Sequence, residues 1–162
     1  MKSTIEHKNG FTLVEVMVVL ILLTLSFMVF LRALNTGETI RARSEIRTTQ
    51  SVILNSLENE IRARRFDENA SYPWSSVLGK DIGESQLIDF DDIDDFNGYY
   101  ISSISGQPAF SCSVAVNYVA VSSGFHSSQS GQSNFKSVMV KISHATLPAI
   151  IDTMVIGINN RR

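Results

Sequence analysis

The sequence of 162 residues lacks the features that mark several classes of protein. Its single cysteine excludes a disulfide framework within the chain, and the Cys/His spacing of a zinc site is absent. Three prolines and nine glycines are too few for a collagen-like or low-complexity chain, and a hydrophobic content of 44% excludes a disordered polymer. The net charge of −2 and the pI of about 5.9 argue against nucleic-acid binding.

The arrangements of residues that carry catalysis are also missing. The sequence contains no G-x-S-x-G nucleophile motif and no glycine-rich phosphate loop. Its three histidines stand apart, at His7, His126 and His144. We therefore expect a protein that is not an enzyme and that uses no cofactor.

The apolar residues are concentrated near the N-terminus. Residues 11–31 read FTLVEVMVVLILLTLSFMVFL and carry one charge, Glu15. As a helix this segment spans about 31 Å, close to the hydrocarbon thickness of a bilayer. It has no polar stripe of the kind that a helix on the surface of a soluble domain shows. The segment predicts a transmembrane helix.

A polar leader, MKSTIEHKNG, precedes this segment over residues 1–10. Its two lysines outnumber its one glutamate, so the positive-inside rule predicts a cytoplasmic N-terminus and a head exported to the periplasm. No A-x-A-like cleavage site follows Leu31, which argues against an ordinary secretory signal peptide. We expect the apolar segment to stay attached to the mature protein.

Glu15 is unusual within an apolar segment, because a carboxylate there costs about 2.5–3.5 kcal/mol on insertion scales. A cut after Gly10 would leave a new cation, the α-amino group of Phe11, at the same end of the helix. In an assembly, Glu15 could pair with the Phe11 amine of a neighbouring subunit. That pairing would remove both the energetic cost of an unpaired carboxylate and that of an unpaired ammonium group in an apolar environment.

The stretch Gly10-Phe11-Thr12-Leu13-Val14-Glu15, with its short basic leader and following apolar span, resembles the class III signal of type IV prepilins. The resemblance covers roughly the first 35 residues. It implies that a prepilin peptidase cuts between Gly10 and Phe11 and methylates the new Phe11 terminus, and that Glu15 is the assembly glutamate. It also implies an inner-membrane protein whose partners are other pilin or pseudopilin subunits and an inner-membrane assembly platform.

The resemblance leaves the kind of subunit open. Major pilins often carry a helix-kinking proline in or just after the apolar segment, whereas this chain has none before Pro73. That difference favours a minor pilin or a pseudopilin of a type II secretion system. A tip adhesin or ligand-binding subunit, and a plain single-span membrane protein with a periplasmic domain, are the further alternatives.

Beyond Leu31 the pattern becomes amphipathic, which predicts that the helix continues to about residue 66. The apolar residues that define one face are Ile46, Ile53, Leu54, Leu57 and Ile61. The predicted organisation is therefore a leader (1–10), a transmembrane or filament-core helix (11–31), an amphipathic continuation (32–66) and a globular head (67–162).

The head should contain an antiparallel sheet. Apolar and polar residues alternate over 110–121 and 137–143, and further strands are expected at 153–158 and 99–105, with short connections. The apolar face of this sheet needs cover, and the amphipathic half of the helix can supply it. We predict an α+β fold in which the long N-terminal helix packs on the C-terminal sheet, with Cys112 as a buried thiol.

The irregular stretch 66–98 includes an acidic segment, DFDDIDDFNG, at residues 89–98. Its candidate calcium ligands are Asp91, Asp92, Asp94 and Asp95, since Ca²⁺ prefers carboxylate oxygens. The spacing does not fit an EF-hand loop, because Ile93 falls where the first aspartate should be. A solvated turn whose aspartates cap backbone groups and an acidic patch that docks a basic neighbour are the alternatives. The segment is also similar to an acidic stretch in minor prepilins of the mannose-sensitive haemagglutinin pilus.

Overall fold

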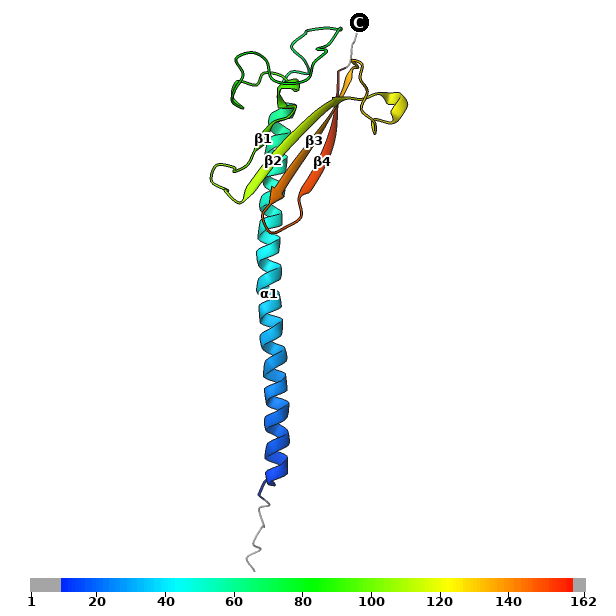
Figure 1. The fold of residues 1–162 in the computed structure, drawn as a ribbon. Helices are drawn as coiled ribbons and strands as arrows, with labels where there is room; N and C mark the ends of the chain where they lie inside the picture. The colour runs from blue at the N-terminus through cyan, green and yellow to red at the C-terminus, as the bar shows by residue number, and fades with distance from the viewer. Residues whose placement is uncertain (1–9, 159–162) are drawn as a thin grey trace, which may run out of the picture. The chain divides into compact units, whose positions relative to one another are not determined.

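The computed structural model describes residues 10–158 and shows one long helix and a four-stranded antiparallel sheet, the α+β fold that the sequence predicts (Figure 1). The chain divides into two compact units, Met1–Glu45 and Ile46–Arg162. The predicted leader, residues 1–9, lies outside the described residues. The elements are α1 (Leu13–Arg62), η1 (Asp94–Phe96), β1 (Tyr100–Ile101), β2 (Phe110–Tyr118), η2 (Val121–Ser123), β3 (Phe135–His144) and β4 (Ile150–Gly157).

In the first unit, every side chain of α1 up to Glu45 is exposed. The threonine hydroxyls of this part donate hydrogen bonds back into the helix itself. Thr24 donates to the carbonyl of Ile21 at 2.8 Å, and Thr36 donates to the carbonyl of Arg32 at 2.9 Å. The helix therefore satisfies its backbone and these hydroxyls internally, which an apolar solvent requires.

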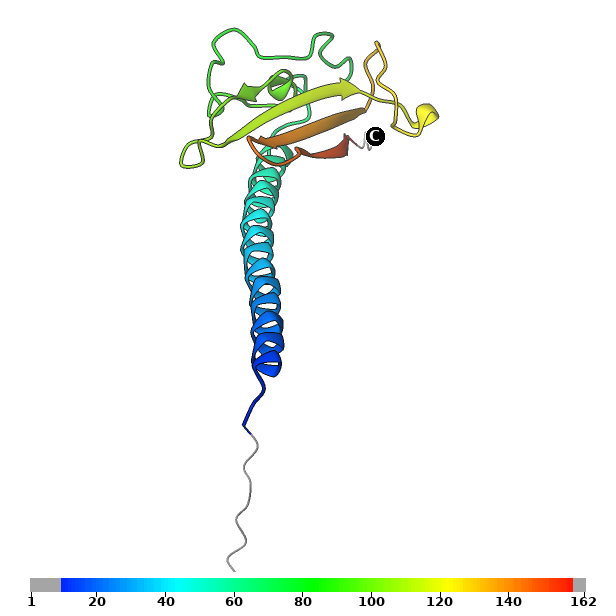
Figure 2. The ribbon, with the colours of Figure 1, turned by 60° about the horizontal axis from the view of Figure 1, so that its bottom comes forward.

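In the second unit, the part of α1 from Ile46 onward packs against one face of the sheet (Figure 2). Its buried residues recur at helical spacing: Gln50, Leu54, Leu57, Glu58 and Ile61. The amphipathic face predicted from the sequence is thus the face that covers the sheet.

The sheet has the order β1-β2-β3-β4, and each neighbouring pair is antiparallel. On the covered face, β2 and β3 place apolar residues directly opposite one another, in the pairs Cys112–Ile142, Val114–Val140 and Val116–Val138. All six of these side chains are buried, which confirms the predicted alternation and the buried Cys112 thiol. Burial raises the pKa of that thiol, so it stays protonated in the core.

Three of the boundaries that differ from the sequence-based prediction do so for identifiable local reasons. The helix ends at Arg62 rather than near residue 66, because Arg65 leaves the helix to pair with the segment around Asp92. Strand β2 ends at Tyr118, and η2 follows and closes at Gly124, whose φ of 61° is left-handed. Strand β1 is only two residues long, because the chain turns back at Ile104, which bridges Gln107.

The isoleucines on the two faces of the sheet provide a stability test. Ile142 is fully buried, whereas Ile151 is 58% exposed on the neighbouring strand β4. We expect Ile142→Ala to lower the free energy of unfolding by about 2–5 kcal/mol, because it leaves a cavity in the core. Ile151→Ala should change it by less than about 1 kcal/mol. Urea unfolding of the full chain in detergent, followed by tryptophan fluorescence, measures both, and equal losses would contradict the assignment of the core face.

Candidate processing site and buried ion-pair cluster

The helix α1 begins with a side-chain cap. The Thr12 hydroxyl accepts a hydrogen bond from the backbone N–H of Glu15 at 3.2 Å, and the Thr12 carbonyl accepts the N–H of Val16 at 3.2 Å. Thr12 is therefore the N-cap residue, and Thr12 to Glu15 has the T-x-x-E spacing of a capping box. This spacing is visible in the sequence, but the role of Thr12 as a cap was not predicted from it.

Gly10 lies just outside the helix and is exposed. A Cβ atom built there meets no heavy atom within 4 Å. Nothing in the described fold therefore requires glycine at this position. A requirement for glycine has to come from a molecule that handles this segment.

Glu15 lies in the first turn of α1 and is exposed. Within residues 10–158 its carboxylate forms no ion pair. Its side chain lines a shallow apolar hollow together with Phe11. The two residues that are predicted to pair between neighbouring subunits therefore lie on the same side of the helix in one chain. A carboxylate in the first turn is also stabilised by the positive end of the helix dipole.

The surface that follows Glu15 is apolar and uncovered. Between Leu13 and Leu34 the large apolar side chains are 48–77% exposed. The helix is long and apolar enough to cross a membrane, with a mean hydropathy of 2.7 in its most apolar window and none of that window buried. A surface of this size is not stable in water and has to be covered by lipid or by other protein.

Comparison with known families agrees with this geometry. Residues 7–31 match the family model described as the prokaryotic N-terminal methylation motif. The N-terminal segment therefore carries a prepilin-type methylation motif. Neither a search of curated proteins nor a search of solved structures returned a match. The match covers the N-terminal motif and the apolar segment that follows it, and it does not extend to the head.

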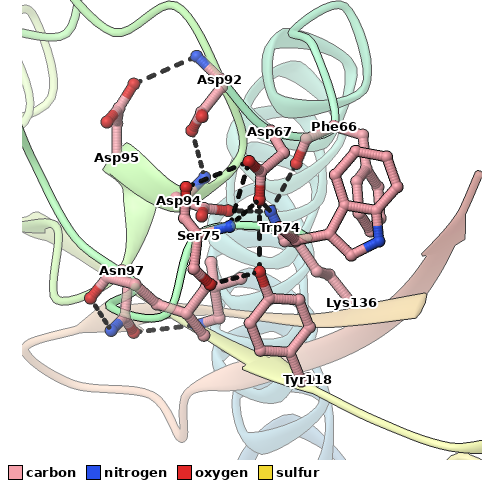
Figure 3. Close-up of polar contacts among 12 residues, drawn as sticks. Phe66, Asp67, Trp74, Ser75, Asp92, Asp94, Asp95, Asn97, Tyr118 and Lys136 are labelled. Atoms are coloured by element: carbon pink, nitrogen blue, oxygen red, sulfur yellow. Dashed lines mark hydrogen bonds and ion pairs between the residues drawn. The ribbon is translucent and has the colours of Figure 1, made fainter. Parts of the chain in front are cut away.

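The head contains a buried ion-pair cluster (Figure 3). Lys136 of β3 is fully buried, and its Nζ forms ion pairs with Asp67 Oδ2, at 3.0 Å, and with Asp94. The same Nζ donates to the carbonyl of Phe66 and lies 4.4 Å from the centroid of the Phe66 ring. Asp67 follows the end of α1 and Asp94 begins η1, so the cluster joins the helix end, the acidic segment and the sheet.

The two carboxylates of the cluster have different surroundings. Asp67 accepts the backbone N–H and the hydroxyl of Ser75 and the backbone N–H of Asn69, and the Tyr118 hydroxyl lies 3.2 Å from its Oδ2. Burial alone would raise the pKa of Asp67, but these hydrogen bonds and Lys136 lower it below its usual value.

Asp94 is buried with far fewer partners. Its Oδ1 contacts Lys136, while its Oδ2 has no hydrogen-bond partner among the described residues. Burial raises the pKa of Asp94 to about 7, because Lys136 offsets only part of the desolvation. The cluster therefore holds one carboxylate that is stabilised as an anion and one that is readily protonated.

The other aspartates of the acidic segment mainly cap backbone groups. Asp95 Oδ2 accepts the backbone N–H groups of Asp91 and Asp92, and Asp92 Oδ1 accepts that of Asp94. The predicted capping is confirmed, but the prediction that the turn is solvated is wrong, because Asp92, Asp94 and Asp95 are buried. Asp91 is exposed and pairs with Arg65 of the same chain.

The four candidate calcium ligands do not converge on one point. Asp91, Asp95 and Glu84 each place one carboxylate oxygen within 4.8 Å of the others. Asp94 faces Lys136 instead. The calcium site at Asp91, Asp92, Asp94 and Asp95 stays a prediction.

Lys136 was not identified from the sequence, although a signal was present. It stands two residues before Val138 in the same alternating pattern as Val140 and Ile142, so it faces the core. A lysine on the apolar face of a strand requires buried acceptors, since an unpaired buried ammonium group is costly. Its partners Asp67 and Asp94 lie 69 and 42 residues away along the chain, and sequence spacing does not reveal them.

Replacing Lys136 should strongly destabilise the head. Lys136→Met keeps most of the side-chain volume but leaves two buried carboxyl groups without their cation, and we expect a loss of about 3–5 kcal/mol in the free energy of unfolding. The matched control is Lys141→Met, on the same strand but exposed, which should change it by less than about 0.5 kcal/mol. Chemical denaturation of the two variants tests this, and a Lys136→Met protein as stable as the control would contradict the role of the cluster.

The lowered pKa of Asp67 gives a pH dependence with a defined sign. The ionised form is favoured in the folded state, so its stabilisation is complete above the unfolded pKa of about 3.9 and is lost as the pH falls through the folded pKa. Each unit by which folding lowers this pKa is worth about 1.4 kcal/mol. Asp67→Asn should therefore reduce stability at neutral pH and flatten its decline between about pH 4 and pH 2.

The control for this measurement is Asp89→Asn, because Asp89 is exposed. Thermal unfolding of the three proteins across this pH range provides the comparison. An Asp67→Asn variant that declines as steeply with acid as the unmodified protein would contradict the assignment.

Proposed function

We propose that this prepilin-like protein is a structural, non-enzymatic minor subunit of a type IV filament system. Prepilin peptidase cuts it between Gly10 and Phe11 and methylates the Phe11 amine. The subunit waits in the bacterial inner membrane as a single-pass protein with its head in the periplasm, and an inner-membrane assembly platform then moves it into a filament of other pilin subunits.

The uncovered apolar surface of α1 is the observation that carries this proposal. It follows directly on a methylation-type signal, and it is long enough for a bilayer. The same surface can pack against the helices of other subunits after it leaves lipid, because both environments are apolar. A plain membrane anchor has no need for the signal that precedes the helix here.

Gly10 and Glu15 support the same proposal. The fold does not require glycine at position 10, which fits recognition of this residue by a peptidase. Glu15 has no ionic partner in residues 10–158 and lies beside Phe11, which fits a carboxylate that waits for the terminal amine of a neighbouring subunit.

The unbroken α1 favours a minor subunit over a major one, since no proline interrupts Leu13–Arg62. A pseudopilin of a type II secretion system is the alternative that fits the same features. A tip adhesin would need a ligand site on the head, and the acidic segment, much of which is engaged in capping its own backbone, offers less support for one.

The proposed processing predicts the mature N-terminus. Mass spectrometry of the protein isolated from membranes should find a chain that begins at Phe11 and carries one methyl group on its amine. Gly10→Val should leave the chain at full length, because a branched side chain obstructs the peptidase while the fold has room for it. Recovery of the unmodified protein with Met1 intact would contradict the proposal.

The proposed pairing predicts a selective defect of Glu15→Gln. This variant keeps the size of the side chain and the backbone N–H that Thr12 caps, but it removes the charge. We expect normal cleavage and membrane level, and a drop of about tenfold in the amount cross-linked into assemblies, which corresponds to about 1.4 kcal/mol of lost interaction.

The matched control is Glu38→Gln, an exposed acid farther along the same helix. Whole-cell chemical cross-linking followed by immunoblotting gives the readout for both variants. Normal assembly of Glu15→Gln, or an equal defect in the control, would refute the pairing.

A further inference from the structure

The buried cluster in the head brings an amine and a carboxyl group together away from water. The Lys136 side chain is fully buried, and Asp67 and Asp94 are 4% and 3% exposed. Aromatic rings enclose the amine, with the centroid of Phe66 at 4.4 Å and that of Tyr118 at 5.3 Å from Nζ. Nothing in the role of a filament subunit accounts for a lysine in this position.

The two carboxyl groups differ in their hydrogen bonds, and this difference suggests a different role for each. Both oxygens of Asp67 accept bonds from Ser75, so its position is fixed while Oδ2 lies 3.0 Å from Nζ. Asp94 touches Nζ through Oδ1, and its Oδ2 is buried without a hydrogen-bond partner in residues 10–158. Asp67 is therefore placed to accept a proton from the amine, and Asp94 is placed to receive the amine itself.

We propose that Lys136 and Asp94 join in an intramolecular amide bond, with Asp67 as the base. The bond would link β3 to η1 covalently inside the head. It adds a covalent modification to the proposed filament subunit and does not depend on which filament the protein serves.

The reaction is balanced without an oxidant, a reductant or another reactant. Asp67 takes one proton from the Lys136 ammonium group, and the neutral Nζ attacks Cγ of the protonated Asp94. The Cγ–Nζ bond forms, the nitrogen gives up a second proton, and the Asp94 hydroxyl leaves with that proton as water. The products are one amide, one water molecule and an Asp67 carboxyl group that holds the first proton.

The surroundings favour the attack on Asp94 and the loss of water. The raised pKa of Asp94 keeps a fraction of its carboxyl group protonated near neutral pH, and only the protonated group loses water readily. Fixing the reacting groups in contact replaces an encounter in solution by a unimolecular step. An apolar enclosure also limits access of water for the reverse reaction.

Trypsin digestion of the full chain, isolated from membranes, tests the bond directly. No lysine or arginine lies between Lys80 and Lys136, so an ordinary digest gives peptide 81–136. Trypsin does not cut after a lysine whose Nζ is acylated. The proposal predicts peptide 81–141, lighter than its sequence by the mass of one water, with the link between Asp94 and Lys136 located by fragmentation.

Loss of water alone is not sufficient evidence, because an aspartate can also lose water by cyclising onto its own backbone. That product would leave Lys136 free, and trypsin would still release peptide 81–136. Resistance to cleavage and the missing water must therefore occur together in one peptide. If most of the chain gives unmodified peptide 81–136, the proposal is wrong.

The digest also tests which carboxyl group reacts. A bond to Asp67 would join peptide 66–80 to peptide 81–141, and that result would overturn the assignment to Asp94. Asp94→Asn should still react, because an amine can displace ammonia from a carboxamide. Its peptide should then be lighter than its sequence by the mass of ammonia rather than of water.

Two further variants test the roles of the other groups. Lys136→Arg keeps the positive charge but cannot form the bond, and Asp67→Asn keeps both reacting groups but removes the base. Both should give peptides without the link and should migrate more slowly than the unmodified protein in denaturing gels, because the segment between Asp94 and Lys136 can extend. The control Lys141→Arg, on the same strand, should retain the bond. An Asp67→Asn protein that is fully linked would overturn the role of Asp67.

Discussion

An apolar surface that the chain does not cover is the constraint on which this structure depends. The first part of α1 exposes large apolar side chains over several turns, at a cost in water of about 25 cal/mol per Å². Lipid can cover this surface before assembly, and neighbouring apolar helices can cover it afterwards. In the proposed assembly, the partner of the single acid in this surface, Glu15, would decide how the helices align, because an unpaired carboxylate is costly in either environment.

The helix α1 has two different surfaces, because its sequence changes from wholly apolar to amphipathic along its length. Up to Glu45 its side chains are exposed, and from Ile46 onward one face is buried in the head. The apolar residues of that face are spaced for contact with a sheet, whose own apolar face is formed by Val114, Val138 and Val140. Such patterns are local, and for that reason the helix, the strands and the α+β fold could be predicted from the sequence.

Contacts between distant parts of the chain were harder to predict. The strands differ from prediction at their ends because a turn at Gly124 and a bridge at Ile104 stop the pairing early. The proposed processing residues Gly10, Phe11 and Glu15 form a local motif, and a resemblance over a short segment was therefore enough to point to them. The cap formed by Thr12 is equally local and could have been found from its distance to Glu15.

The buried cluster shows why the remaining features could not be predicted. Aspartates 89–95 suggest solvent or a cation by composition, yet three of them are buried and one faces Lys136. Whether an aspartate is solvated depends on where the sheet places a lysine far along the chain, and sequence pattern alone does not contain that information. The inward position of Lys136 on β3 was the one clue, since a buried ammonium group has to be paired.

Site-specific photo-crosslinking from the apolar helix tests the central claim most directly. A photoreactive residue at Leu22, which is 60% exposed in the isolated chain, should capture the apolar helix of another filament subunit in cells that assemble filaments. The same residue should capture only lipid where assembly is blocked. Capture of lipid alone in assembling cells would show that the helix is a permanent membrane anchor and would contradict this account.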